Sequence, residues 1–501
     1  MNSYIGDEAV IRYCEDEILP AYDEAQKQRD AQYPVWSARA IYDHAVGSLS
    51  WPASCAKHLA ECRAALGLVP PVPVPLPPIP VPTGTVRVEN GALIDDRGPF
   101  NGLGASLFWA LWGCKFDRER LDQNLATLQP GRFDYVRIFA QVGESEQDVA
   151  WGDRYIDPDW PDYATVLQGT LDLCATHGMR VAMCIFAYIK RFRTEAACKQ
   201  FLDKIVAAIQ GREHLILHWE IANEGHGTGG TRDQMRDLCR YLRARVKGPV
   251  AITAAQDPVE ACHLYDGDIA TLGTEHFDRD TSKADGPWRP IRQPWGWPGE
   301  YAAAWGAAYP GVPAPKLPPC SNNEPIGPYS SVAVEHDPLR LVTAAAVTYI
   351  SGGPAYVYHC GPGIFGGGRA AARDHSPANF WEVPGLRETL LGYAVLRDLL
   401  PGGISGWSRS NSGWGNFPWT RITSDGTEGD GCVRSYATDN GSHVVCVPFG
   451  IRDHVTLAEK RPMTWKVHSV LDGHLIQSGT GDLRVRQSDG SAQVIIGRFN
   501  G

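Results

Sequence analysis

The chain lacks any long apolar run and any concentration of positive charge. The 501-residue sequence contains no uninterrupted apolar run of about 18 residues, so we expect no membrane span. Acidic residues outnumber basic ones, the formal net charge is -10, and lysine and arginine do not cluster as contacts to nucleic-acid phosphates require. These absences argue against a nucleic-acid partner, and the mildly acidic balance suits a neutral or cationic ligand.

A secretory leader and a disulfide framework are also missing from the pattern. Residues 1–30 are acidic and polar, without a basic start and an apolar run, so we expect synthesis in the cytoplasm without a conventional signal peptide. The 13 cysteines are odd in number and show no repeated CxxC spacing, which favours reduced thiols over disulfides.

Two motifs fall short of a metal or cofactor site. Asp278 to Asp285 has calcium-like spacing, but Lys283 stands where such a loop needs glycine. Gly361 to Gly366 satisfies GxGxxG, but glycines and a polar run follow where a dinucleotide-binding unit has an apolar helix. We interpret the second segment as a flexible loop and expect no cofactor and no metal.

Proline marks the clearest boundary in the chain. Residues 70–82 hold eight prolines, which predicts a polyproline II spacer over residues 70–83, about 40 Å long if fully extended. Residues 1–69 show apolar positions at helical spacing, which predicts a small helical module. This module either docks onto another protein or particle or is a stabilising appendage.

After the spacer, residues 84–402 alternate strand-length apolar runs with amphipathic helical patterns such as Tyr163–His177, Glu195–Gln210 and Thr231–Val246. This alternation predicts an α/β fold, a (β/α)8 TIM barrel. The eight candidate strands are Phe100–Leu107, Tyr135–Ala140, Arg180–Phe186, Leu215–Ala222, Val250–Ala254, Ile269–Glu275, Lys316–Asn322 and Ala355–Cys360.

Residues 403–501 change to short alternating segments separated by glycine and aspartate turns. This pattern predicts a C-terminal antiparallel β-sandwich, which we expect to brace the barrel. Examples of these segments are Gly431–Tyr436, His443–Pro448, Thr464–Leu471, Asp482–Gln487 and Ala492–Phe499.

Two Asn-Glu pairs follow strands four and seven of the predicted barrel. Asn223-Glu224 comes directly after Trp219-Glu220-Ile221-Ala222, and Asn323-Glu324 follows the seventh strand. The carboxyl ends of barrel strands gather at one face, so the two carboxylates are expected to converge there. A pair of carboxyl groups is what glycosidic bond cleavage requires, one as acid and the other as nucleophile or base. Glu220, inside the strand, is expected to join a buried network.

With these residues the chain resembles the retaining glycoside hydrolases of clan A, such as glycoside hydrolase family 5, over about residues 84 to 400. The resemblance implies that Glu224 is the acid/base, Glu324 the nucleophile, and Asn223 the donor to the sugar 2-hydroxyl. It also implies that Arg137 keeps the nucleophile ionised and that His276 lies at the end of strand six. The subfamily is undetermined, because Gly225 replaces a common proline and Asp278 a common tyrosine.

Further sugar contacts are predicted among the aromatic residues. A loop after strand six holds Trp288, Trp295, Trp297 and Trp305, whose faces can form a carbohydrate platform or pack beneath the loop. Strand eight offers Tyr356, Tyr358 and His359 where the family usually has tryptophan. The predicted substrate contacts are Asn223, Arg137, His276, Trp109, Trp295, Trp297 and Tyr358.

The sequence therefore predicts a retaining glycoside hydrolase acting on a poly- or oligosaccharide. The alternative is a structural adhesion protein that binds glycan on a barrel scaffold without cleaving it. A helical module and spacer ahead of such a barrel, with no leader, also suggest a phage-particle protein that degrades a host surface polysaccharide and is released by lysis.

Overall fold

The chain divides into two compact units, Met1–Pro78 and Ile79–Gly501, and every residue described below belongs to the second. The computed structural model describes residues 82–145, 154–225, 227–253, 267–272, 288, 290–291, 303, 305–307, 309–313, 318–368, 376–410, 420–425, 436–439, 442–450, 454–459, 463–481, 483–486 and 492–500. The predicted N-terminal helical module, most of the proline spacer and the segment 278–285 lie outside these residues.

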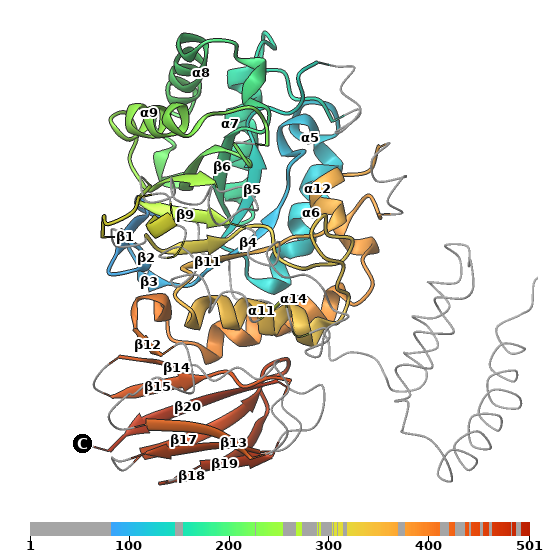
Figure 1. Cartoon of the computed structure of the whole chain (residues 1–501). Coiled ribbons are helices and arrows are strands. Elements are labelled where there is room, and N and C mark those ends of the chain that lie inside the picture. The colour runs from blue at the N-terminus through green and yellow to red at the C-terminus, as the bar shows by residue number, and fades with distance from the viewer. Residues whose placement is uncertain are drawn as a thin grey trace, which may run out of the picture. The chain divides into compact units, whose positions relative to one another are not determined.

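Eight parallel strands form a closed barrel, which confirms the predicted fold (Figure 1). The barrel strands are β4 (Gly102–Ser106), β5 (Tyr135–Phe139), β6 (Arg180–Phe186), β7 (Ile216–Ala222), β8 (Val250–Thr253), β9 (Ile269–Leu272), β10 (Cys320–Asn322) and β11 (Ala355–Tyr358). Each lies within its predicted range, and β11 pairs with β4 to close the ring. Of the predicted seventh strand, the described residues 318–322 contain the three-residue strand β10, and Pro318 and Pro319 stay outside it because proline cannot donate to a ladder.

Helices lie around the barrel (Figure 1), and in the described part of the chain they follow strands β4, β5, β6, β7, β10 and β11. They are α5 (Ala110–Phe116), α6 (Arg118–Leu128), α7 (Tyr163–Thr176), α8 (Glu195–Ala208), α9 (Arg232–Arg243), α11 (Pro338–Ile350), α12 (Gly361–Phe365) and α14 (Leu386–Leu399). Single 3₁₀ turns are η2 (Gln129–Gly131), η3 (Ile189–Arg191), η4 (Glu213–Leu215), η9 (Phe380–Glu382) and η10 (Ile404–Gly406). In the part of the chain that the structure describes, no helix combines the length and apolar character needed to cross a bilayer.

The interpretation of the GxGxxG segment as a flexible loop is wrong. Gly361–Phe365 is the short helix α12, and its first four residues are buried. A side chain at position 363 would lie 2.0 Å from the Ser106 carbonyl oxygen, so glycine serves close packing there.

The barrel interior and its outer surface form separate apolar clusters. Leu217 faces inward with Tyr135, whereas Ile216, Trp219 and Ile221 pack outward. The outward positions Ile216 and Trp219 are three residues apart, since the pairing register between β6 and β7 shifts at this point. This bulge turns the next residue, Glu220, toward the barrel interior.

A small antiparallel sheet that the sequence did not predict closes the amino end of the barrel. It consists of β1 (Arg87–Glu89), β2 (Ala92–Asp95) and β3 (Gly98–Phe100). Leu93 of this sheet packs into the inner apolar cluster. The ion pair between Asp95 and Arg180, 2.9 Å apart with both side chains buried, ties the sheet to the start of β6.

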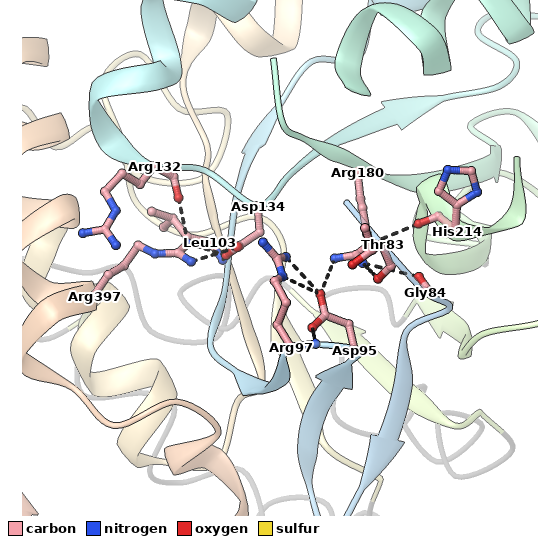
Figure 2. A network of polar contacts seen from close by, with 10 residues as sticks. All are labelled: Thr83, Gly84, Asp95, Arg97, Leu103, Arg132, Asp134, Arg180, His214 and Arg397. Carbon is pink, nitrogen blue, oxygen red and sulfur yellow. Dashed lines mark hydrogen bonds and ion pairs between the residues drawn. The ribbon is translucent and has the colours of Figure 1, made fainter. Parts of the chain in front are cut away.

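Backbone carbonyls and a second ion pair extend this amino-end network (Figure 2). Arg180 also donates to the carbonyl oxygens of Thr83 at 2.7 Å and His214 at 3.0 Å. Asp134, just before β5, accepts hydrogen bonds from the Leu103 amide and from Arg397 of α14, both at 2.9 Å. The network therefore joins strands, the closing sheet and the last barrel helix.

The C-terminal region contains two antiparallel sheets, as predicted for a β-sandwich (Figure 1). The six-stranded sheet has the order β12 (Ser408–Ser410), β14 (Tyr436–Thr438), β15 (His443–Cys446), β20 (Gln493–Phe499), β17 (Met463–Ser469) and β18 (Leu475–Thr480). The three-stranded sheet has the order β13 (Thr420–Asp425), β16 (His454–Glu459) and β19 (Leu483–Arg486). The example segments named from the sequence do not cover β12, β13, β16 or β18, and Gly431–Tyr436 meets β14 only at Tyr436.

Candidate active site

Both Asn-Glu pairs lie where barrel strands end. Asn223 and Glu224 directly follow β7, and Asn323 and Glu324 directly follow β10. Since all barrel strands are parallel, both pairs lie at the carboxyl-end face, where (β/α)8 enzymes build their active sites.

The guanidinium of Arg137, on β5, connects the two strand ends. It donates from Nη1 to Glu324 Oε1 at 2.7 Å and from Nη2 to Asn223 Oδ1, also at 2.7 Å. Its remaining contacts go to Glu220 on β7, from Nε at 3.0 Å and from Nη2 at 2.5 Å. One fixed planar group thus holds a residue of each Asn-Glu pair, with Glu220 setting its orientation.

The charges of this cluster are withdrawn from water. The side chains of Arg137 and Glu220 are fully buried, and that of Glu324 is 10% exposed. Burial alone would lower the pKa of Arg137, but the charges of Glu220 and Glu324 outweigh it and raise that pKa. Arg137 therefore remains a cation, and its charge favours the carboxylate form of Glu324. The predicted buried-network role of Glu220 matches this arrangement.

Hydrogen-bond chemistry fixes which way the Asn223 amide faces. Arginine has donors only, so the Asn223 atom that meets Arg137 must be its carbonyl oxygen. The Nδ2 group of this half-buried residue is then the end of the amide that does not meet Arg137, and it is a hydrogen-bond donor. A sugar hydroxyl is a suitable acceptor for it.

Glu224 has an unusual backbone conformation. Its φ of 43° lies in the left-handed region, which few residues other than glycine and asparagine adopt. The following turn stabilises it, because the Thr228 amide donates to the Glu224 carbonyl at 3.1 Å. The residue is half-buried, so part of it is accessible to solvent. Backbone strain of this kind is common at functional sites.

Asn323 differs from Asn223. It is 1% exposed, and neither its Oδ1 nor its Nδ2 has a hydrogen-bond partner in the structure. The two Asn-Glu pairs are thus similar in sequence but not in environment.

Two phenylalanines that sequence reasoning missed form an apolar wall beside Arg137. The Phe108 and Phe139 rings stack with centroids 3.9 Å apart and an interplanar angle of 15°. The Arg137 guanidinium carbon lies 5.1 Å from the Phe108 centroid and 5.3 Å from the Phe139 centroid. Their position at the ends of strands β4 and β5 was the available signal.

The other predicted sugar contacts lie elsewhere or outside the described residues. Trp109 is buried and donates from its indole to the Pro362 carbonyl at 2.8 Å. Tyr358 is fully buried and packs against Phe133 and Tyr393, with ring centroids 6.4 and 6.0 Å away. Both have core contacts and are not brought to the Arg137 cluster. His276, Trp295 and Trp297 lie outside the described residues.

The tryptophan loop is described at two of its predicted platform residues. Trp288 is buried and packs against Phe449 at 5.3 Å, as packing beneath a loop requires. Trp305 contacts Tyr309 at 4.4 Å. Among the described residues no group of three acidic, cysteine or histidine side chains is arranged to hold a metal ion.

Comparison with solved structures finds the same fold with little sequence similarity. One is described as a glycoside hydrolase, with 12% identity, a TM-score of 0.56 and coverage of 83% of this chain and 97% of that one. Another is a glycoside hydrolase family 5 protein from Bacteroides vulgatus ATCC 8482, with 14% identity, a TM-score of 0.55 and coverage of 84% and 95%. A scan against protein-family models and a search of curated proteins found no match.

Proposed function

We propose that this protein is a glycoside hydrolase that cleaves O-glycosidic bonds of a poly- or oligosaccharide with retention of anomeric configuration. The observation that carries the proposal is the Arg137 guanidinium, which contacts Glu324 and Asn223 at 2.7 Å each from two different strand ends. It contacts one residue of each strand-end Asn-Glu pair at the carboxyl-end face of the barrel.

The two glutamates are assigned different tasks because their surroundings differ. Glu324 is almost buried and bonded to a permanent cation, which keeps it ionised and suited to nucleophilic attack. Glu224 is half-buried and borders the segment after β7, where it can exchange protons with the leaving group and with water. Unequal environments for two carboxyl groups are the usual basis of acid and nucleophile assignments.

The proposed reaction has two displacements. In the first, a Glu324 oxygen attacks the anomeric carbon while Glu224 gives its proton to the departing glycosidic oxygen. In the second, Glu224 takes a proton from water, the water oxygen attacks the same carbon, and the bond to Glu324 breaks. Two inversions give net retention, and both carboxyl groups return to their starting states.

The solved structures of the same fold include proteins described as glycoside hydrolases, which supports the reaction class. A fold of this kind hosts many chemistries, so the argument for the reaction rests on the site residues. The alternative of glycan binding without cleavage has less support, because binding alone does not require a buried arginine that keeps a strand-end carboxylate ionised. Association with a phage particle stays a prediction, and mass spectrometry of purified particles would test it.

The decisive experiment is turnover on a panel of polysaccharides and aryl glycosides, followed by NMR of the first-formed anomer. We expect reducing sugar of retained configuration, and activity reduced at least 1,000-fold in Glu324→Gln, in line with the loss of a covalent nucleophile. His474→Gln, an exposed change in the C-terminal region, is the control and should retain full activity. Binding without turnover by the unmodified protein would favour the adhesion protein instead.

A further inference from the structure

His359, just after β11, lies buried between two serines from different parts of the barrel. Its Nδ1 is 2.7 Å from the Oγ of Ser106, the last residue of β4. Its Nε2 is 3.0 Å from the Oγ of Ser331, which lies in the segment that follows Glu324. The imidazole is fully buried, so both of its nitrogens satisfy their hydrogen bonding through these hydroxyls.

The segment after Glu324 also touches the His359 backbone. A side chain at Gly327 would place its first carbon 1.8 Å from the His359 carbonyl oxygen, so the two backbones are in direct contact. The Gly361 amide donates to the Pro328 carbonyl at 2.9 Å. Three successive attachments therefore connect residues 327–331 to residues 359–361.

The segment 325–331, which these contacts hold against residues 359–361, begins immediately after Glu324. Ser330 closes it on itself, because its hydroxyl donates to the Pro325 carbonyl at 3.2 Å. The His359 ring also lies 5.8 Å from Phe108, which covers the Arg137 guanidinium. The imidazole is thus linked to Glu324 along the chain and to Arg137 through the apolar wall.

We propose that His359 is a positioning residue that holds the segment 325–331 against the ends of β4 and β11 and thereby keeps Glu324 in place at Arg137. The proposal rests on the proposed function, since it assigns Glu324 the nucleophile role. It does not place His359 in contact with substrate. His359 acts on the position of the Glu324 carboxylate through the segment between them.

The first test is amide hydrogen exchange in His359→Ala and Ser331→Ala, which needs no substrate. Ser331 is exposed and small, so its replacement removes one hydrogen bond without threatening the fold. We expect exchange between Ile326 and Glu335 to rise at least tenfold while exchange in β6 and β7 is unchanged. Unchanged exchange in the segment overturns the proposal whether or not the protein has activity.

The second test is kinetic and separates positioning from general structural damage. We expect Ser331→Ala to lower kcat about tenfold with KM within a factor of two, and to move the acidic limb of the pH profile upward. The limb moves because Glu324 loses part of its contact with the Arg137 cation. His359→Gln, which keeps one donor and one acceptor, should restore part of the kcat lost in His359→Ala.

Gly327→Ala provides an independent variant, because it pushes the segment away from His359 without altering a polar group. It should reproduce the kinetic signature of Ser331→Ala. Raised exchange with unchanged kcat and pH profile overturns the positioning role. If the variants show raised exchange but the unmodified protein hydrolyses no glycan, His359 still holds the segment 325–331 and the proposed function is refuted. The two failures are therefore distinguishable.

Discussion

Arg137 and Glu324 are 187 positions apart in the chain, yet Nη1 and Oε1 lie 2.7 Å from each other in a site nearly closed to water. Glu220 accepts two hydrogen bonds from the guanidinium, at Nε and Nη2, and these bonds fix the orientation in which Nη1 meets Glu324. The consequence is a carboxylate with a fixed position and a permanent counter-charge.

Replacing Arg137 with lysine tests that directionality. Lysine keeps the charge but is a point charge on a flexible stem, so it cannot contact Glu220, Glu324 and Asn223 together. We expect kcat/KM to fall at least 100-fold, and the acidic limb of its pH profile to move upward as Glu324 loses stabilisation. The control is Arg97→Lys. Arg97 is a half-exposed arginine that pairs with Asp95 at 2.9 Å, at the opposite end of the barrel, and its replacement should leave the profile unchanged.

Replacing Glu220 with glutamine tests the burial of the cluster. The change leaves a fully buried guanidinium with one carboxylate in place of two. Removing one partner of a buried ion pair costs about 3 kcal/mol, so the free energy of unfolding should drop by that amount in a urea titration. Activity should also fall, since Arg137 loses the partner that orients it. Wild-type stability in Glu220→Gln would contradict the arrangement.

A comparison of Glu224→Gly with Glu224→Ala tests the backbone strain at this position. Both variants lack the carboxyl group and should lose acid/base catalysis equally. Glycine accepts a φ of 43° without penalty and alanine does not, so the glycine variant should be more stable by about 1 kcal/mol. Denaturant unfolding measures the difference, and equal stabilities would show that the left-handed conformation carries no strain.

Replacing Asp95 with asparagine tests the opposite end of the barrel. Arg180 would keep its carbonyl acceptors at Thr83, Gly84 and His214 but lose its buried carboxylate partner. We expect the free energy of unfolding to fall by about 3 kcal/mol with kcat within a factor of two, because the amino end of a barrel serves stability. A large loss of kcat in folded protein would contradict this division.

His218 should make the protein sensitive to mild acid. Burial lowers the pKa of this residue to about 4 from its ordinary value of 6.5. The unfolded chain binds a proton at this histidine below pH 6.5 and the folded chain does not until about pH 4. The free energy of unfolding should therefore fall by about 3 kcal/mol in total as the pH drops through this interval.

The matching experiment compares unfolding at pH 7 and pH 4.5 in His218→Leu and in the unmodified protein. The variant cannot bind the proton, so it should lose less stability between the two pH values, whatever its stability at pH 7. His214→Gln, at a partly exposed histidine, serves as the control. A pH dependence that is the same in all three proteins would contradict the assignment.

The sequence was sufficient for the barrel because buried parallel strands read as continuous apolar runs between helical patterns. The two Asn-Glu pairs could be found because the end of a strand is a local signal, whereas Arg137 was assigned from the family resemblance and Glu220 from its place inside the strand. The structure brings Arg137 into hydrogen-bond contact with Glu220, Asn223 and Glu324. The three short strands Arg87–Glu89, Ala92–Asp95 and Gly98–Phe100 were missed because they are too short to show alternation. Their place depends on a long-range ion pair, Asp95 with Arg180.

Side-chain direction was the main limit of sequence reasoning at the site. Tyr358 and His359 are neighbours, but the tyrosine packs against Phe133 and Tyr393 while the histidine lies between Ser106 and Ser331. A one-residue difference in a strand reverses the side chain's face, and sequence spacing alone did not reveal which face was which. The partners of His359 come from segments far apart in the chain.

The bulge in β7 has a consequence for how the chain can vary in length. Because Ile216 and Trp219 both pack outward, the strand contains one residue more than simple alternation allows before Glu220. Deleting a residue there would turn the side chains on one side of the deletion to the opposite face of the strand. Either the apolar anchors would turn inward or the carboxylate would face the helices, so the residue count of this strand is itself under constraint.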